Sequence, residues 1–476
     1  MGDAAFDLSF SVEHRFRPFA LVAPAFVAVT AERAEPGVTL AEGGPVAPYA
    51  AVEMRVSVPP GGGGQVVAGL SAPGDGDQVL VVYDAARGRV AIEVRVDGRR
   101  LQVRRKSVRL PGEFRLAFVL CENRVTALVA DPDTGDGHDA WRPVLSERAR
   151  VAEALDLRDP ATLEPLAYAW GTRWPTRGPD PGDPAGAPVV SAVRAGLFGM
   201  VGLRDLHLVQ HADGRPYTRG GRTYLTATCA GTGFFQQAHW GVFSFDAADP
   251  ADLRQEAQLF STRDGLVLGD HAGQVVRTPD DRGWIVATSS WGDFEPGSIH
   301  VRHAATTDDV LHGVHVLETE PTPMPTTLGA WDPGLTLIDG RWHVSFVESS
   351  SQHPFRFWPR LAVGPPGADW TVGLEAVGER PRMRHCEGPI LTRVDGTWWF
   401  LASDGGRRCY PVFTTGMERV GRVDAPYLTN IPHPQVVPMA DGSHLILTFD
   451  GTRFGDKVLG YGGHGDVVVM RSPSPG

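Results

Sequence analysis

The sequence predicts an all-β protein in which an N-terminal β-sandwich is followed by a five-bladed β-propeller. Glycine and proline supply 57 and 39 of the 476 residues, which favours many short strands joined by turns. Segments with period-two alternation fill the first third of the chain, and a loosely repeated unit fills the last 280 or so residues. The length exceeds what one hydrophobic core usually serves, so at least two domains are expected.

Short alternating segments between residues 50 and 150 predict the sandwich. Examples are "AVEMRVSV", "QVVAGLSA" and "FRLAFVLC", and turns such as Val-Asp-Gly separate them. The pattern resembles the concanavalin-like jelly-roll modules often attached to carbohydrate-active enzymes, so residues 1–155 are predicted to form such a module. Residues 156–194 are predicted to be a linker or long loop, because "PTRGPDPGDPAGAP" has almost nothing to bury. The segment just before that stretch holds the one convincing helix.

Five segments in residues 195–476 share a plan: an acidic or histidine-bearing opening, a β run, a turn, and a second run rich in aromatics. Their openings are Asp205, Asp270, Asp332, Glu387 and His433, separated by 65, 62, 55 and 46 residues. Such a period is typical of propeller blades. Because the innermost strand of each blade runs beside the central axis, the openings are predicted to converge in one wet funnel. Residues 195–476 are therefore predicted to form a domain of five blades.

Three of these openings carry motifs: "LRDLH" with Asp205, "WDPG" with Asp332, and "CEGP" with Glu387. With these motifs in this order, the last 280 or so residues resemble the five-bladed propeller glycosidases, the clan of arabinanases, β-xylosidases and α-arabinofuranosidases. The family's proline after the first aspartate is Leu206 here. The resemblance implies a glycoside hydrolase that cleaves a small glycoside or oligosaccharide, a furanoside or pentoside, with inversion. It implies Asp205 as general base, Glu387 as general acid and Asp332 as the pKa modulator that orients and tunes this acid.

The chemistry explains why carboxyl groups are needed. Inversion requires one protonated and one ionised carboxyl group about 6.5 to 9.5 Å apart, and a third carboxylate nearby favours the protonated form of the acid. Each acid also has a structural alternative. Glu387 could pair with Arg384 or Arg408 at a strand entry, and Asp332 could simply open an Asp-Pro turn.

Polar and aromatic side chains near the motifs are predicted to bind substrate, since sugar rings stack on tryptophan. The predicted substrate-binding residues are Arg204, His239, Trp240, Asp270, His271, Trp291, Trp331, Arg408 and Tyr410. Asp270 and His271 could also act together as an acid–base pair.

No cofactor is expected to be required. In many members of the family a last-blade histidine sits beside a central metal ion or water, and His433 matches it. His433 and His464 are therefore predicted as candidate ligands of a structural calcium or other ion on the axis, although turn histidines often serve only as hydrogen-bonding groups.

Net charge and the distribution of apolar residues exclude some classes of binding partner. A net charge of −11 argues against nucleic acid, which requires a concentrated basic surface. The N-terminus lacks a basic region before its apolar stretch, and no run of about 18 apolar residues occurs, so a cytoplasmic protein without a membrane span is expected. Four widely spaced cysteines predict buried free thiols. The expected partner is a small-molecule carbohydrate or glycosylated metabolite, and the oligomeric state is left open.

Two other functions remain open at this point. An intracellular biosynthetic enzyme, a cyclase, lyase or transglycosylase of secondary metabolism, could use Asp270, His271 and Glu387 for proton transfer on the same scaffold. A non-catalytic carbohydrate-binding protein could use the acids only as hydrogen-bond acceptors. The sequence leaves open the sugar, its anomer, endo or exo attack, and the role of the sandwich.

Overall fold

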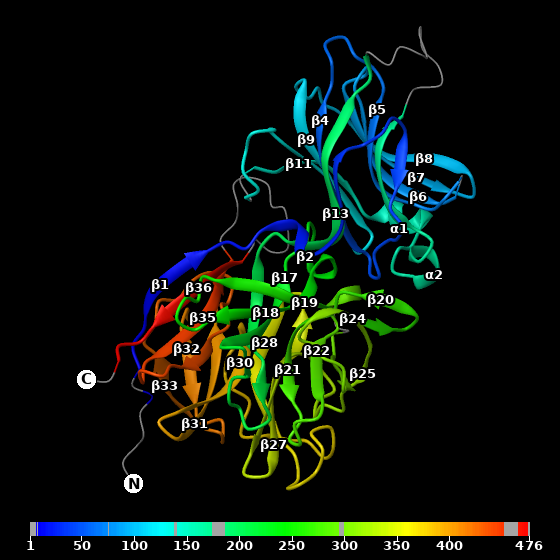
Figure 1. Ribbon diagram of the computed structural model, residues 1–476. Helices are drawn as coiled ribbons and strands as arrows, with labels where there is room; N and C mark the ends of the chain where they lie inside the picture. Colours follow the sequence, from blue (N-terminus) through cyan, green and yellow to red (C-terminus); the bar gives the residue numbers. More distant parts are fainter. Residues whose placement is uncertain are drawn as a thin grey trace.

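The chain folds almost entirely into β-strands, which confirms the predicted all-β class. The computed structural model in Figure 1 describes residues 6, 8–74, 76–137, 140–173, 186–294, 299–451 and 465–474. Two short helices, α1 (Ala149–Ala154) and α2 (Pro160–Leu163), stand where the sequence predicted one. The break between them follows from Leu155, which is extended, and from Asp159, which caps α2 with its side chain. No described helix combines the length and apolarity that crossing a bilayer requires.

Two six-stranded antiparallel sheets pack face to face in the upper part of Figure 1. The first contains, in spatial order, β11 (Arg142–Glu147), β10 (Arg124–Ala130), β9 (Glu113–Cys121), β4 (Tyr49–Ser57), β13 (Val189–Met200) and β2 (Ala20–Arg33). The second contains β3 (Val38–Leu40), β12 (Ala167–Arg173), β5 (Gln65–Ser71), β6 (Gln78–Asp84), β7 (Arg89–Val96) and β8 (Arg99–Ser107). Val52 and Phe118 of the first sheet share one buried core with Val81 and Ile92 of the second. The two sheets form a β-sandwich, and its finer jelly-roll topology stays a prediction.

Five further sheets form the lower part of the molecule in Figure 1. The first contains β14 (Leu203–Leu208), β17 (Arg222–Cys229), β18 (His239–Asp246), β19 (Leu253–Arg263) and β20 (Leu266–Leu268), with β16 (Thr218–Arg219) and β24 (Gly313–Glu318) added at its sides. The second contains β15 (Gln210–His211), β21 (His271–Arg277), β22 (Trp284–Ser289), β23 (Val301–Thr306) and β25 (Glu320–Pro321). The third contains β26 (Gly329–Ile338), β27 (Arg341–Gln352), β28 (Phe355–Val363) and β29 (Glu375–Val377). The fourth contains β30 (Cys386–Val394), β31 (Thr397–Asp404), β32 (Tyr410–Phe413) and β33 (Arg419–Val423). The fifth contains β34 (Gln435–Pro438), β35 (His444–Asp450), β36 (Asp466–Arg471) and β1 (Ser11–Phe16).

The inner strands of these sheets form a ring. Strands β14, β21, β26, β30 and β34 contact one another in this order, and β34 contacts β14 again. Glutamine side chains tie the ring together: Gln435 Oε1 accepts from Leu208 N at 3.0 Å, while Gln274 Nε2 donates to Leu208 O at 3.2 Å. Gln274 Oε1 in turn accepts from Leu335 N at 2.7 Å. These buried bonds satisfy backbone groups that would otherwise be costly to bury, so they fix the inner strands relative to one another.

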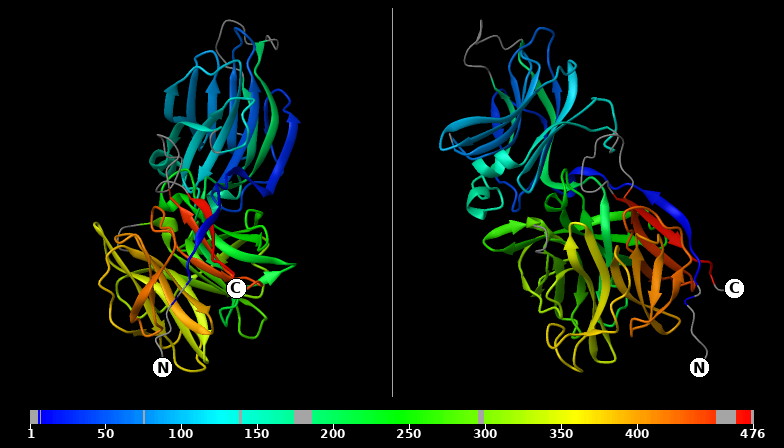
Figure 2. Two further views of the ribbon diagram at one scale, coloured as in Figure 1. Left: turned by 90° about the vertical axis from the view of Figure 1, so that its left-hand side faces the viewer. Right: turned by 180° about the vertical axis from the view of Figure 1, so that it is seen from behind.

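The N-terminal strand belongs to the last propeller sheet, which corrects the predicted boundary at residues 1–155. Strand β1 pairs antiparallel with β36, from Ser11 opposite Arg471 to Phe16 opposite Val467. Figure 2 shows this segment running along the outside of the last sheet before the chain enters the sandwich. The pairing covers an edge strand that would otherwise expose its backbone groups. A short segment next to the terminus carries no sequence signal for so distant a partner.

The linker predicted at residues 156–194 is wrong over most of its described part. Strand β12 lies between β3 and β5, and β13 lies between β4 and β2. Their residues are mostly buried, so they contribute to the sandwich core rather than connect two domains. Residues 174–185, which hold most of the Pro-rich stretch, lie outside the described residues.

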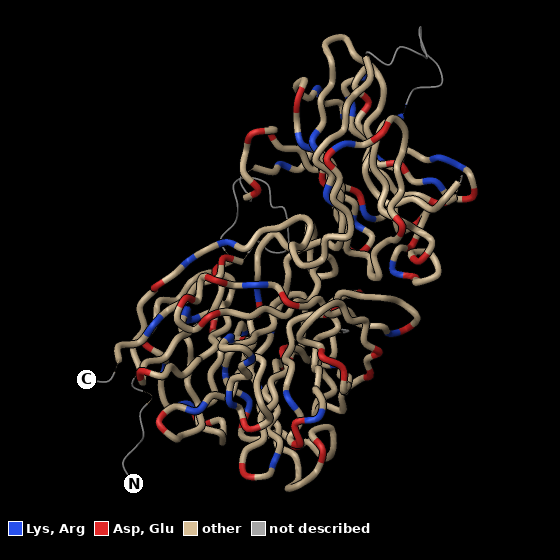
Figure 3. The backbone as a smooth tube through the Cα atoms, in the orientation of Figure 1, with Lys and Arg blue, Asp and Glu red and all other residues tan. Residues whose placement is uncertain are grey.

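The sandwich rests on the first propeller sheet through an apolar contact. Tyr49, Val119 and Cys121 of the sandwich share a buried cluster with Ala230 and Phe260 of the propeller. All four cysteines are buried free thiols, as predicted. Figure 3 shows acidic and basic residues interspersed over both parts of the molecule.

Candidate active site

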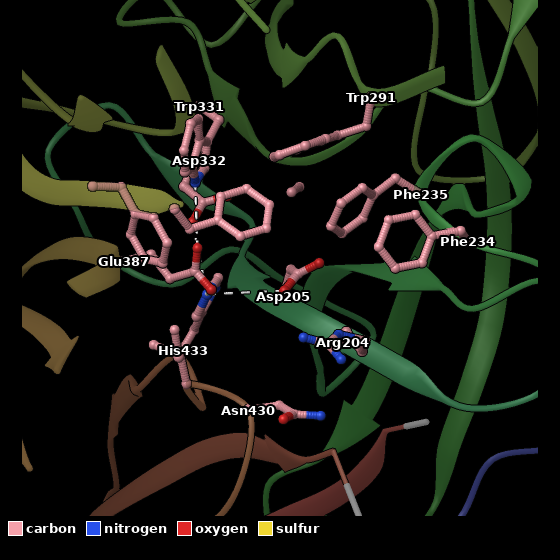
Figure 4. A pocket seen from close by; sticks show the side chains of 14 residues that line it. Arg204, Asp205, Phe234, Phe235, Trp291, Trp331, Asp332, Glu387, Asn430 and His433 are labelled. Carbon is pink, nitrogen blue, oxygen red and sulfur yellow. Dashed lines mark hydrogen bonds and ion pairs between the residues drawn. The ribbon is translucent and has the colours of Figure 1, made fainter. Parts of the chain in front are cut away.

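A pocket of about 290 Å³ lies where the inner strands of the propeller begin (Figure 4). Its lining residues are Arg204, Asp205, Phe234, Phe235, Ala272, Trp291, Trp331, Asp332, Phe355, Phe357, Glu387, Asn430, Ile431 and His433. They come from all five propeller sheets or the loops between them. The three predicted catalytic acids are therefore brought to one pocket.

A repeated β-bulge places the acids. The register of the inner strand shifts in four sheets, between Arg204 and His207 in the first and at the corresponding points of β21, β26 and β30. The bulged residue has a positive φ in each case: 50° at Asp205, 56° at Ala272, 51° at Asp332 and 62° at Gly388. Aspartate and glycine tolerate this conformation better than most residues. A bulge turns its side chain away from the regular alternation, so the two aspartates point into the pocket.

This register differs from the one predicted from the openings. The residue equivalent to Asp205 and Asp332 is Ala272 in the second sheet, not Asp270, and Glu387 stands one position before the bulge.

Gly388 explains the glycine after Glu387. A Cβ at Gly388 would lie 2.3 Å from His433 Cγ, so only glycine permits the histidine ring to approach. Gly388 N also donates to Asp332 Oδ2 at 3.1 Å. Asp332 N donates to Ser289 Oγ at 3.0 Å, and that hydroxyl donates to the carbonyl of Ala272. Three neighbouring sheets are thus linked at the base of the pocket.

His433 lies among the three acids. Its Nε2 is 3.6 Å from Asp332 Oδ2 and 3.8 Å from both Asp205 Oδ1 and Glu387 Oε1. These last two oxygens are therefore no more than about 7.6 Å apart, twice 3.8 Å, a limit that admits both the separation of inverting pairs and the shorter one of retaining pairs. The Glu387 side chain is 19% exposed, whereas that of Asp332 is 8% exposed. Glu387 is thus the more accessible of these two acids.

The pKa values of Asp332 and His433 are both raised, for different reasons. Burial raises the pKa of Asp332 to about 8; the positive charge of His433 opposes this, and the negative charges of Glu387 and Asp205 add to it. Burial would lower the pKa of His433, but the carboxylates of Asp332, Glu387 and Asp205 raise it to about 9. The two shifts depend on one another, because among the carboxylates the ionised Asp332 raises the pKa of His433 most, and the imidazolium in turn opposes the rise at Asp332.

Six aromatic side chains form one continuous wall of the pocket, the aromatic wall. It consists of Phe234, Phe235, Trp291, Trp331, Phe357 and Phe355. Successive ring centroids lie 4.0, 4.7, 5.4, 5.5 and 5.9 Å apart in that order. Trp331 Nε1 donates to Glu387 Oε2 at 3.3 Å, so the wall also orients one of the acids. Flat apolar faces beside carboxylates suit a ring-shaped ligand.

The sandwich holds one end of the aromatic wall in place. Phe234 and Phe235 belong to a turn that continues as the 3-10 helix η2 (Phe235–Gln237). The hydroxyl of Tyr49, on sandwich strand β4, shares its one proton between the carbonyl oxygens of Gln236 at 2.8 Å and Ala238 at 2.9 Å. This gives the sandwich a direct contact with a wall of the pocket.

A buried carboxylate of the sandwich supports the same turn. Gln237 Nε2 donates to Glu122 Oε2 at 3.1 Å, and Gln237 Oε1 accepts from Phe234 N at 2.7 Å. Arg148 binds Glu122 through two hydrogen bonds of 2.7 and 2.9 Å. Because the carboxylate is paired, its burial is compensated and it can act as a rigid acceptor.

Some predicted substrate-binding residues line the pocket and others do not. Arg204, Trp291 and Trp331 line it. His239, Trp240, Asp270, His271, Arg408 and Tyr410 are absent from its lining. The corrections have physical reasons, which differ from residue to residue.

Asp270 is a structural ion-pair partner. It is 1% exposed and binds Arg263 through hydrogen bonds of 2.8 and 3.1 Å, and it accepts from Gly292 N at 2.9 Å. His271 is fully buried behind Trp291, with Nδ1 2.9 Å from Gly269 O. The two therefore do not form an acid–base pair in the pocket.

The other three buried residues serve packing. His239 packs against Tyr49 and Phe260, with ring centroids 5.0 and 5.6 Å away, and burial lowers its pKa to about 3. Trp240 packs within the core between the first two propeller sheets, and Tyr410 packs between the last two. Arg408 is exposed and lines a neighbouring hollow.

The side chains around His433 show how well the predicted metal site fits this pocket. One ligand atom each from Asp332, Glu387 and His433 lies within 4.8 Å of the others, a spacing that a small cation could bridge. Coordination would require His433 to lose its proton, whereas its raised pKa favours the imidazolium. His464 lies outside the described residues, so the paired ligand set and the axial ion stay predictions. We assign no chemical step to a metal.

The sequence did not identify most of the aromatic wall. None of the wall's other residues belongs to the repeated openings: a turn holds Phe234 and Phe235, and strand β28 holds Phe355 and Phe357. The segment before His433 adds Asn430 and Ile431 to the pocket lining. The sequence signal for the aromatic wall was the adjacent Phe-Phe pair at 234–235, and in the structure Phe234 is exposed.

Comparison with known proteins gives structural neighbours only. No family model matches the chain, and no curated protein matches it. An inulosucrase from Halalkalicoccus jeotgali bound to kestose is 12% identical with a TM-score of 0.42, covering 57% of this chain and 85% of its own. The GH43_1 enzyme from Xanthomonas citri complexed with xylose is 13% identical with a TM-score of 0.38, covering 56% and 87%. An alpha-L-arabinanase from Penicillium chrysogenum complexed with arabinobiose is 10% identical with a TM-score of 0.34, covering 76% and 90%. We therefore base the function on the geometry of the pocket.

Proposed function

We propose that this protein is a glycoside hydrolase that cleaves a small glycoside or oligosaccharide, a furanoside or pentoside, with inversion. The observation that supports this is the convergence of Asp205, Asp332 and Glu387 around His433, in a pocket walled by aromatic rings. Three acids from three sheets within ion-pair distance of one imidazole are costly to assemble, because like charges repel and burial disfavours ionisation. Such clusters are typical of catalytic sites.

In the proposed reaction, Glu387 donates a proton to the glycosidic oxygen as the bond to the anomeric carbon breaks. Asp205 accepts a proton from the water whose oxygen attacks that carbon from the opposite face. Asp332 stays protonated and orients the acid through the backbone of Gly388, which donates to it. His433 balances the negative charge of Asp205, whose Oδ1 lies 3.8 Å from its Nε2. The aromatic wall holds the substrate and limits access of other water.

The test begins with a panel of aryl furanosides and pentosides. For a substrate found in this panel, Asp205→Asn should lower kcat by about 100-fold or more, whatever the leaving group. Glu387→Gln should lower it as strongly for a glycoside of an alcohol but much less for a dinitrophenyl glycoside, because that leaving group departs without a proton. Equal loss with both leaving groups would remove the acid role from Glu387.

Proton NMR of the first product separates inversion from retention. An inverted anomer supports Asp205 as a base, whereas a retained anomer would make Asp205 a nucleophile and transfer to other sugars possible. Binding of sugars without turnover of any glycoside in the panel would favour a non-catalytic binding protein. The alternative that uses Asp270 and His271 for proton transfer loses support, because Arg263 neutralises Asp270 outside the pocket.

A further inference from the structure

A second hollow, of about 340 Å³, adjoins the pocket and has its own lining. It shares four lining residues with the pocket: Phe355, Phe357, Asn430 and Ile431. Its remaining lining residues are His385, Gly405, Arg408, Tyr427 and Leu428. A ligand can therefore extend from one space into the other along the Phe355 end of the aromatic wall.

The second hollow lies on the Glu387 side of the pocket. The segment that leads into β30 forms part of it: Phe357 N donates to Arg384 O at 2.9 Å, and His385 Nε2 is 3.0 Å from Phe355 O. Glu387 follows His385 by two residues. Phe234 and Phe235 stand at the opposite end of the aromatic wall, on the far side of Asp205 from Glu387 (Figure 4). An acid that protonates a leaving oxygen must face the leaving group, so the leaving group extends toward the second hollow.

The chemistry of the second hollow is apolar with one positive charge. Phe355, Phe357 and Ile431 offer flat or branched apolar surface. Arg408 is its one lining residue that is always charged, and no Asp or Glu occurs among its described lining residues. Across the described part of the chain, no carboxylate lies within ion-pair distance of Arg408, whose Nη2 donates to the carbonyl of Tyr427 at 3.2 Å.

Arg407, the residue before Arg408, has a carboxylate partner within the protein. Arg407 is paired with the buried Asp404, with Nη1 2.9 Å from Oδ2. Asp404 also accepts from the backbone of Gly406 and Arg407, which fixes the turn. Arg408 follows in a left-handed conformation, with φ of 53°, and its guanidinium lies over the Tyr427 ring at 5.6 Å. The turn thus directs one arginine to a protein carboxylate and the next to the second hollow.

We propose that the second hollow binds the leaving group of the substrate, and that this group is an aromatic ring bearing a carboxylate. This inference rests on the proposed glycosidase function, because the bound group is a leaving group only if a glycosidic bond is cleaved. The ring packs on Phe355 and Phe357, and the carboxylate accepts hydrogen bonds from Arg408. A glycoside of an aromatic acid then places its sugar among the three acids, with the glycosidic oxygen beside Glu387.

The test compares 4-hydroxybenzoate with 4-hydroxybenzamide, which has the same shape without the charge. Isothermal titration at pH 7 should give binding of the acid about ten-fold tighter than that of the amide. Arg408→Gln should abolish this preference, because acid binding weakens far more than amide binding. Arg407→Gln is the matched control and should keep the preference, because that arginine already has a partner. Equal binding of acid and amide to the unaltered protein, or a preference that survives in Arg408→Gln, would overturn the proposal.

Two further measurements separate its failure from that of the proposed function. If glucuronate is bound through Arg408 and 4-hydroxybenzoate is not, the anionic group belongs to a sugar, and the aromatic class is wrong. Hydrolysis of uncharged aryl glycosides with no gain for the carboxylated ones would refute the inference alone. Arg408-dependent binding of 4-hydroxybenzoate without any glycosidase activity would refute the proposed function and leave the aromatic-acid site in place.

Discussion

Tyr49→Phe tests whether the sandwich positions the aromatic wall. The substitution removes only a hydroxyl, which donates to the carbonyls of Gln236 and Ala238 at 2.8 and 2.9 Å from a fully buried ring. Losing a buried hydrogen bond and leaving its acceptors unsatisfied costs about 1 to 2 kcal/mol. If this cost falls on the turn, its opening equilibrium increases about 5- to 30-fold.

Hydrogen exchange measures this opening without a known substrate. The backbone N–H of Gln237 donates to Phe234 O at 3.0 Å, and that of Ala238 donates to Phe235 O at 3.1 Å. Their exchange follows the opening equilibrium, so a peptide covering residues 234–238 should exchange about 5- to 30-fold faster in Tyr49→Phe. With a substrate in hand, KM should rise more than kcat falls, because the chemical groups are untouched.

Tyr83→Phe is the matched control. Tyr83 is also a buried sandwich tyrosine whose hydroxyl bonds a backbone group, accepting from Leu110 N at 3.2 Å, but it lies within the sandwich core. It should lower Tm by a similar amount and leave exchange of residues 234–238 unchanged. If Tyr49→Phe lowers Tm without faster exchange of that turn, or if Tyr83→Phe accelerates it equally, the positioning role is refuted.

Three further predictions concern the buried charges and the bulge. The pKa of Asp332 is raised from 3.8 to about 8, so its contribution to folding stability is full below pH 4 and is lost as the pH rises through 8. The Tm of Asp332→Asn should therefore rise relative to that of the parent protein between pH 5 and 9. A Tm difference that stays constant over this range would contradict the prediction. Gly388→Ala should unfold at a clearly lower urea concentration than Gly396→Ala. Both glycines have a positive φ, 62° and 77°, but a Cβ at Gly388 would lie 2.3 Å from a side-chain atom, whereas a Cβ at Gly396 would have nothing within 4 Å. Asp270→Asn should cost about 1.5 to 3 kcal/mol in urea unfolding, because the buried Arg263 guanidinium loses one carboxylate partner and keeps Asp293. It should leave kcat/KM per folded molecule unchanged. A large loss of kcat/KM at unchanged stability would return Asp270 to the chemistry.

Local pattern was enough for the strand content and for the acids. Alternation with a period of two follows from which side chains face a core, so it can be read within a few residues and predicted the all-β class. Asp205, Asp332 and Glu387 were singled out by short motifs in a repeat, and the pocket brings them together with His433. Their roles stay a proposal.

Only the tertiary structure decided which side chains share a space. A bulge lies at the corresponding point of four inner strands, and its position in β21 makes Ala272, rather than Asp270, the equivalent of Asp205 and Asp332. The pairing of β1 with β36 and the contact of Tyr49 with the Gln236 turn join segments that are far apart in sequence. Such contacts depend on how whole sheets pack, which no local pattern encodes. The sequence by itself therefore determined the strands and the candidate acids, and packing determined the wall, the charge partners and the hollow beside them.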